Sequence, residues 1–100
     1  MKEEPFVEYK LDFTDIDSVE KLHDYLAEKL PLPDHYGRNL DALYDSLMEM
    51  PLCMISLYNF AALEALGDYA LSLAEVFEAA STDNLRLMII YVTGGNEDGI

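Results

Sequence analysis

Alternation and runs of hydrophobic residues predict three β-strands in this chain. Residues 6–13 (FVEYKLDF) alternate with a period of two, broken only at Phe6, and this pattern is typical of a half-buried strand. Residues 52–57 (LCMISL) form a short apolar run that predicts a buried strand with Cys53 in the core. Residues 85–92 (LRLMIIYV) form a longer β-rich run, which favours a strand buried on both faces.

An amphipathic helix is predicted after the first strand. Its apolar stripe recurs at i, i+3, i+7 and i+11, and consists of Val19, Leu22, Leu26 and Leu30. Either Asp17 or Ser18 can cap this helix, and Pro31 requires it to end at or before the preceding residue. A loop of residues 32–38 follows.

Two further helical segments flank the second strand. One helix is expected to begin at Asn39, a favourable capping residue, and to end before Pro51. A short helix is expected over residues 60–66, closed by Gly67 at its C-terminus.

The last predicted helix is capped by Asp68 and ends near Ser81, where the cluster STDN indicates a turn. Helical spacing places Leu71, Ala74 and Phe77 on its inward face, with Leu73 and Val76 as further candidates.

The predicted order of elements is β-α-α-β-α-α-β, which indicates the α/β class. Long helical crossovers favour a three-stranded parallel sheet packed with about four helices, because antiparallel neighbours would be joined by hairpins. One hundred residues are expected to form a single domain, residues 1–100. Residues 93–100 (TGGNEDGI) are expected to be a flexible tail.

The net charge of the protein indicates which kinds of partner it attracts and which it repels. Acidic residues outnumber basic ones 20 to 6, so the formal net charge is −14 and the pI is about 4.1. This excess repels nucleic acid and anionic membranes, and it attracts basic partners. Solubility alone is the alternative explanation. The start of the chain (MKEEPFVEYK) lacks the apolar region of a signal peptide, and no apolar run reaches 18 residues, which predicts a cytoplasmic protein.

The helix predicted from Asn39 has two unlike faces. Leu40, Leu43 and Leu47 lie on the side expected to face the core, whereas Asp41, Asp45 and Glu49 lie at i, i+4 and i+8 on the other. Such like-charge neighbours destabilise a helix by about 0.2–0.5 kcal/mol per pair. An ordinary solvated face is one explanation, and the helix dipole favours the carboxylate of Asp41. Asp45 lies a turn further in and lacks that compensation.

Aromatic and sulfur-containing side chains border the acidic row (Asp41, Asp45 and Glu49). They are Tyr44, Met48 and, from the preceding loop, His35 and Tyr36. Exposed aromatic residues beside carboxylates favour a protein interface. Carboxylates resemble phosphates in charge and in hydrogen-bond acceptor geometry, so this surface suits a protein site whose Arg and Lys residues bind nucleic-acid phosphates.

The sequence supports an enzymatic function less well than a binding function. No nucleotide-binding, zinc-protease, CxxC or hydrolase motif occurs, and the single cysteine, Cys53, excludes an internal disulfide. Asp41 and Asp45 as an acid–base or magnesium pair, and Ser46 near His35 as a nucleophile, both lack convergent partners. His23, at the edge of an apolar stripe, is predicted to be a hydrogen-bonded structural residue. No metal, cofactor or catalytic residue is expected.

The segment LPLPDHYGRNLDALYDSL, residues 30–47, closely resembles the core of the barstar family, small acidic inhibitors of barnase-type ribonucleases. The family pattern is matched at Leu32, Pro33, Asp34, Tyr36, Gly37, Asn39, Leu40, Asp41, Ala42, Leu43, Tyr44 and Asp45. A weaker, colinear similarity extends from about Leu11 to Val92, and the predicted order of elements is the one this family has.

The resemblance implies that this helix and the loop before it enter the active site of a basic, extracellular-type ribonuclease. Asp45 would occupy a phosphate position and accept hydrogen bonds from catalytic Arg and His residues, while Asp41 would meet another basic group. The implied partner-binding residues are His35, Tyr36, Gly37, Asn39, Asp41, Tyr44, Asp45, Met48 and Glu49. The protein would be a monomer when free. A binding or immunity module for a different basic toxin is the alternative.

Three positions depart from the family pattern. His35 stands where the best-known member has tyrosine, which would make the contact depend on pH. Arg38 replaces an acidic residue and places a positive charge that a basic partner would disfavour. Ala79 stands where an interfacial glutamate is expected, so one peripheral salt bridge would be missing. These departures suggest a partner that differs from the best-known nuclease.

Overall fold

Three parallel strands form one sheet, as the sequence pattern predicts. The computed structural model describes residues 7–92, so the tail predicted at 93–100 lies outside the described residues. The strands are β1 (Val7–Asp12), β2 (Cys53–Tyr58) and β3 (Leu87–Val92), in the order β1-β2-β3. Val7 pairs with Cys53, and Cys53 pairs with Leu87, so the first residues of the three strands are aligned in register.

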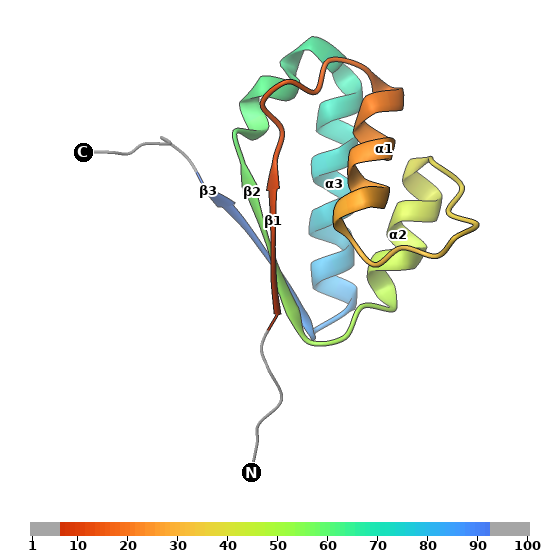
Figure 1. Ribbon diagram of the computed structural model, residues 1–100. Coiled ribbons are helices and arrows are strands. Elements are labelled where there is room, and N and C mark those ends of the chain that lie inside the picture. The colour runs from red at the N-terminus through yellow and green to blue at the C-terminus, as the bar shows by residue number, and fades with distance from the viewer. Residues whose placement is uncertain (1–6, 93–100) are drawn as a thin grey trace.

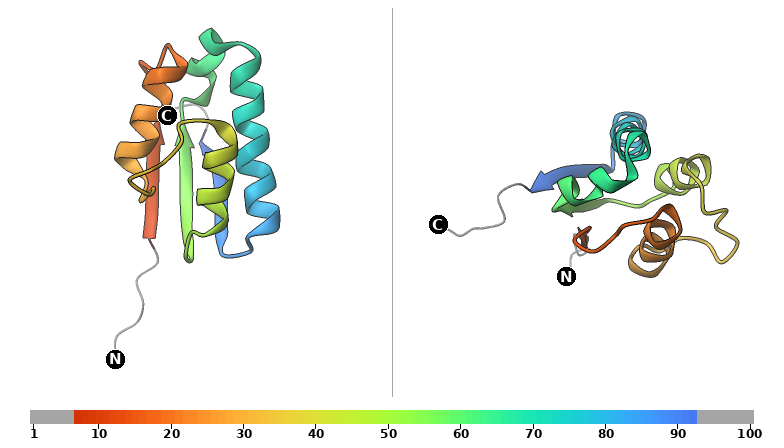
Figure 2. Two further views of the ribbon diagram at one scale, coloured as in Figure 1. Left: turned by 90° about the vertical axis from the view of Figure 1, so that its right-hand side faces the viewer. Right: turned by 90° about the horizontal axis from the view of Figure 1, so that it is seen from above.

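Helical segments connect the strands and cover one face of the sheet. They are α1 (Val19–Lys29), α2 (Leu40–Met48), the 3-10 helix η1 (Phe60–Leu66) and α3 (Asp68–Asp83). Strands that follow one another in the sheet and are joined by right-handed crossovers have their connecting helices on the same face. Figures 1 and 2 show α1, α2 and α3 together on one side of the sheet, with η1 beyond the end of β2. The predicted α/β order is confirmed, with a 3-10 helix as the short segment before α3.

The capping residues position the helices. Ser18, and not Asp17, caps α1: its hydroxyl accepts a hydrogen bond from the backbone N–H of Lys21 at 3.1 Å. Asp17 instead forms an exposed ion pair with Lys21 at 3.0 Å. At α3 the prediction was wrong by one residue, because Gly67 (φ 61°) is the N-cap and Asp68 is the first helical residue.

The core lies between the sheet and the helices. Its fully buried side chains come from every layer, and include Leu11, Leu22, Leu26, Leu43, Leu47, Ile55, Leu57, Leu73 and Phe77. The inward positions predicted for α3 were wrong at Leu71, which is 66% exposed, and α3 continues to Asp83 instead of ending near Ser81. Leu73 and Phe77 face the core instead, because residues four apart lie on the same side of a helix.

Burial of β3 on both faces was also a wrong prediction. Met88 and Ile90 are 53% and 37% exposed, whereas Leu87 is buried. Alternate residues of a strand point to opposite faces, and within residues 7–92 a helix layer lies over only one face of this sheet. As an edge strand, β3 therefore has a buried side and an exposed apolar side.

A buried asparagine fixes the C-terminal end of α2. Asn84 is 5% exposed, and its side-chain amide donates to the carbonyl oxygens of Leu47 at 3.0 Å and Met50 at 3.2 Å. The last carbonyl groups of a helix lack partners within the helix, so these bonds satisfy them. Asn84 follows α3 directly and thereby holds the end of α2 against the end of α3. No helix among residues 7–92 is long and apolar enough to span a membrane.

Candidate functional site

A tight loop-to-helix junction sets the start of α2. Asn39 is the N-cap: its side-chain oxygen accepts from the backbone N–H of Ala42 at 2.7 Å, and its amide donates to the carbonyl of Gly37 at 3.2 Å. A Cβ at Gly37 would lie 3.3 Å from Ala42 Cβ, closer than ordinary packing allows. Glycine therefore lets loop 32–38 approach the first turn of α2.

The acidic row lies on the exposed side of α2. Asp41, Asp45 and Glu49 are all exposed, and Asp41 lies in the first helical turn as predicted. The two ion pairs formed within residues 7–92, Lys21–Asp17 and Arg38–Asp24, involve none of these carboxylates. The three charges are therefore hydrated and available to a cationic partner.

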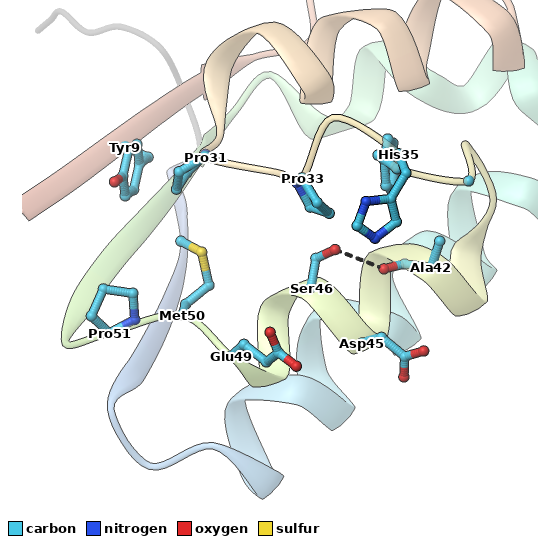
Figure 3. A pocket seen from close by; sticks show the side chains of 12 residues that line it. Tyr9, Pro31, Pro33, His35, Ala42, Asp45, Ser46, Glu49, Met50 and Pro51 are labelled. Carbon is cyan, nitrogen blue, oxygen red and sulfur yellow. Dashed lines mark hydrogen bonds between the residues drawn. The ribbon is translucent and has the colours of Figure 1, made fainter.

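A hollow of about 580 Å³ lies between α2 and the loop before it, and we refer to it as the α2–loop hollow. Pro33, His35 and Tyr36 line it from the loop, while Asp45 and Glu49 line it from α2. Figure 3 shows His35 on the loop side of the hollow, opposite the two carboxylates. The hydroxyl of Ser46 donates to the carbonyl of Ala42 at 3.0 Å (Figure 3), a local helical bond that gives Ser46 no catalytic base.

A second hollow, of about 630 Å³, lies on the other side of α2 and is called the α2–α3 hollow. Residues of α2 and α3 line it: Leu40, Asp41, Tyr44, Asp45, Ser72, Glu75, Val76 and Ala79. The hydroxyl of Tyr44 donates to the carboxylate of Asp83 on α3, and this bond raises the pKa of Tyr44. Asp45 lines both hollows and thus stands on the ridge between them.

His23 ties the loop to the helix layer, which confirms its predicted structural role. The ring is 1% exposed, with Nδ1 2.6 Å from the hydroxyl of Tyr36 in the loop and Nε2 2.7 Å from the hydroxyl of Tyr69 on α3. Burial raises the pKa of both tyrosines, so both stay neutral at ordinary pH. A neutral imidazole satisfies this pair by donating from one nitrogen and accepting at the other.

Stability is expected to decrease in mild acid because of His23. Burial lowers the pKa of His23 below its ordinary value of 6.5, the charge of Arg38 lowers it further, and Asp24 acts in the opposite direction. The unfolded chain then binds this proton at a higher pH than the folded protein does. Stability is therefore complete above about pH 6.5 and falls as the pH drops toward the folded-state pKa, by at most about 1.4 kcal/mol per pH unit.

Urea unfolding between pH 5.5 and 8 measures this effect. In a His23→Gln variant the side chain can still form hydrogen bonds but does not ionise between pH 5.5 and 8. The variant should therefore lose less stability than the parent from pH 7.5 to 5.5. The same substitution at exposed His35 is the matched control and should keep the parent's pH dependence. Equal slopes for the parent and the His23→Gln variant would contradict the assignment.

Arg38 points toward α1 in the structure. Its guanidinium pairs with the carboxylate of Asp24, and both side chains are more than half exposed. Such surface pairs contribute little stability, about 0–1 kcal/mol. The pair does, however, neutralise the positive charge that departs from the expected pattern at this position. Arg38 also has a positive φ of 56°, at the turn where the loop reaches α2.

The structure brings most of the predicted partner-binding residues together. Five of them line the α2–loop hollow: His35, Tyr36, Gly37, Asp45 and Glu49. Asp41 and Tyr44 join Asp45 at the α2–α3 hollow. Asn39 uses its side chain to cap α2, and Met48 is half-buried without lining either hollow. These placements are compatible with a shared binding surface.

Apart from position 79, which the family resemblance marked as interfacial, sequence reasoning missed the contribution of α3. Ser72, Glu75 and Val76 line the α2–α3 hollow, and Asp83 holds Tyr44. Positions 72, 75, 76 and 79 lie at i, i+3, i+4 and i+7, so helical spacing places them on one face. This helical spacing is the sequence feature from which the shared face of α3 could have been predicted. Within residues 7–92, no group of three or more His, Cys, Asp and Glu side chains could hold a metal ion.

Comparison with known proteins points to one family. Residues 6–92 match the model of a family described as Barstar (barnase inhibitor). A protein of Bacillus subtilis (strain 168) named "Putative ribonuclease inhibitor YrdF" is 43% identical over 77 residues, an alignment that covers 73% of this chain and 84% of the relative. The family match spans the acidic row and the residues that line both hollows.

Proposed function

The chain belongs to the barstar family, and on this premise we propose that it blocks the active site of a basic ribonuclease with α2 and loop 32–38. Members of this family are ribonuclease inhibitors, so the chain is an inhibitor and not an enzyme. In the proposed complex the carboxylates of α2 take the positions of substrate phosphates. Inhibition then requires no chemistry from the inhibitor itself.

The exposed acidic row between two hollows is the observation that carries this proposal. Asp45 stands on the ridge between the hollows, where a nuclease could contact it from both sides. A phosphate-binding site presents Arg, Lys and His donors, and a carboxylate accepts the same charge-assisted hydrogen bonds. His35, Tyr36 and Gly37 of the loop would contact the rim of the nuclease site.

Electrostatics favours fast association with a basic partner. The formal net charge of −14 attracts a positively charged nuclease over long distances, and salt screens that attraction. We propose that the free inhibitor is a cytoplasmic monomer that protects the producing cell from its own nuclease. The nuclease is then of the extracellular, barnase type.

Titration of barnase with the purified protein tests the proposal. We expect stoichiometric 1:1 inhibition at low ionic strength, with an association rate that falls at least tenfold between about 50 and 500 mM salt. A net-neutral protein of similar size is the control for non-specific effects. Absence of inhibition at micromolar protein would contradict the proposal for a barnase-type nuclease.

A different basic toxin is the second candidate partner. Two departures from the family pattern support this candidate. Histidine at position 35 and alanine at position 79 both change the surfaces that flank the acidic row. Binding of another basic nuclease together with failure to bind barnase would identify this alternative.

A further inference from the structure

Asn84, the C-cap residue of α3, is a buried polar residue whose side-chain nitrogen and oxygen both have partners. It is 5% exposed. Its amide nitrogen donates to the carbonyl oxygens of Leu47 at 3.0 Å and Met50 at 3.2 Å, and its side-chain oxygen accepts from the backbone N–H of Arg86 at 3.1 Å. Among neutral side chains, only an amide offers two N–H donors together with an oxygen acceptor. The site is therefore specific for an amide.

The two carbonyl groups bound by Asn84 lie on either side of Glu49. The helix α2 ends at Met48, and Glu49 is its C-cap, with φ −100° and ψ 3°. Regular helical spacing therefore fixes the position of Asp45 but not that of Glu49, which lies where the chain leaves the helix. Figure 3 shows Asp45 on α2, with Glu49 and Met50 at the end of the helix, lining the α2–loop hollow. The hydrogen bonds of Asn84 thus set the course of the chain that carries the Glu49 carboxylate.

The C-terminal end of α2 depends on this contact more than its start does. Its last turn contains no basic residue that could bind the free carbonyl groups, and Met50 follows the C-cap where glycine is common. The start of α2 is fixed locally by the side chain of Asn39. Among the hydrogen bonds of residues 7–92, Asn84 provides the only side-chain bonds from a different element to the backbone of α2 and Met50. A nine-residue helix is too short to be stable alone, so such contacts decide how it ends.

We propose that Asn84 is a positioning residue for nuclease binding, which holds the Glu49 carboxylate in place beside Asp45 at the α2–loop hollow. This inference rests on the proposed function, in which carboxylates of this surface meet cationic groups of the nuclease. Asn84 is buried and does not itself contact the nuclease, so it acts through Glu49.

The physical benefit is that the end of α2 is already ordered in the free inhibitor. A nuclease that binds a mobile carboxylate must restrict the chain that carries it, which costs conformational entropy and lowers the affinity. With the amide of Asn84 in place, that ordering occurs when the inhibitor folds. Without the amide, the carbonyl groups of Leu47 and Met50 lose their donors, and the end of α2 moves to let water reach them.

Inhibition of barnase by an Asn84→Ala variant tests the inference at 10 °C, with folding verified by circular dichroism. We expect Kd to rise about fivefold, the cost of ordering one or two side chains on binding. Ile55→Val, at a fully buried position of the central strand β2, is the control for lost stability. It should lower the melting temperature but change Kd by less than about twofold.

Double-mutant cycles show whether Asn84 acts through Glu49. Once Glu49→Gln has removed that charge, Asn84→Ala should change Kd by less than about twofold. The matched cycle uses Asp41→Asn, which removes one charge of the same acidic row near the start of α2, where Asn39 fixes the helix. In that background Asn84→Ala should keep its effect of about fivefold. A merely structural role of Asn84 would give the same coupling to both carboxylates.

Asn84→Asp is a second variant, in which charge and position have opposite effects. It keeps the size of the side chain and adds one negative charge, which by electrostatic attraction alone would strengthen binding to a basic nuclease. The carboxylate has no N–H donor, however, and it faces the carbonyl oxygens of Leu47 and Met50, so it should displace the end of α2. We expect Kd to rise in spite of the added charge.

The results separate the inference from the proposed function. Kd values of Asn84→Ala and Asn84→Asp within about twofold of the parent value, or equal coupling of Asn84 to Glu49 and Asp41, would overturn the inference and leave the proposed function intact. Unchanged binding of Glu49→Gln would also overturn the inference, and this result does not depend on how the Asn84 variants fold. Failure of the parent to inhibit barnase would overturn the proposed function and the inference with it.

Discussion

Replacement of Asp45 by alanine is expected to weaken nuclease inhibition by about 2–5 kcal/mol, or from about 30-fold to several thousand-fold in Kd. That range comes in part from measurements on the barnase–barstar pair itself, so it is a family-based expectation. The physical reason is that the nuclease's Arg and His donors would be left buried and unpaired. Stopped-flow association and dissociation rates measure the loss, which should lie mainly in dissociation.

Two variants separate charge from position. Asp45→Asn keeps the shape of the side chain and one acceptor oxygen but removes the charge, so it should lose most of the affinity that Asp45→Ala loses. Glu20→Gln, on the exposed side of α1, changes the net charge by the same amount away from the proposed interface. It should change Kd less than twofold. Similar losses for Glu20→Gln and Asp45→Asn would contradict a specific role of Asp45.

Local periodicity predicted most of the fold. The alternation in residues 6–13 located β1, and the apolar stripe beginning at Val19 located α1, because each element buries one side. Asn39 correctly marked the start of α2. Errors arose where burial depends on neighbouring elements. Sequence reasoning placed β3 between two covering layers, whereas the right-handed crossovers put α1, α2 and α3 on one face.

The candidate site was partly predictable for a related reason. Its loop and α2 residues are contiguous, so one stretch of sequence carried both the acidic row and the family resemblance. Asp83 and Asn84 contribute through hydrogen bonds to α2 that join residues more than 30 positions apart, and Glu75 lines the α2–α3 hollow with residues of α2. A single sequence shows the helical face of α3, but it does not show which helix packs against that face.

Replacement of Leu47 by alanine is expected to lower the free energy of unfolding by about 2–5 kcal/mol, the largest stability change predicted here. Leu47 is fully buried on the core side of α2, two positions from Asp45 on the opposite side. The lost methyl and methylene groups remove apolar burial and leave a cavity. For a domain of this size, the melting temperature should fall by at least about 8 °C, measured by circular dichroism.

Leu71→Ala is the matched control, because the same substitution at a 66% exposed position of α3 should change stability by no more than about 0.5 kcal/mol.

Inhibition measurements distinguish the effect of a core substitution from that of a substitution on the binding surface. A domain with a stability of about 10 kcal/mol, in the middle of the ordinary range, remains mostly folded after a loss of about 2–5 kcal/mol. Leu47→Ala should therefore inhibit barnase stoichiometrically at 10 °C, whereas Asp45→Ala should be fully folded and bind weakly. Equal loss of stability in both leucine variants would mean that the assigned faces of α2 and α3 are wrong.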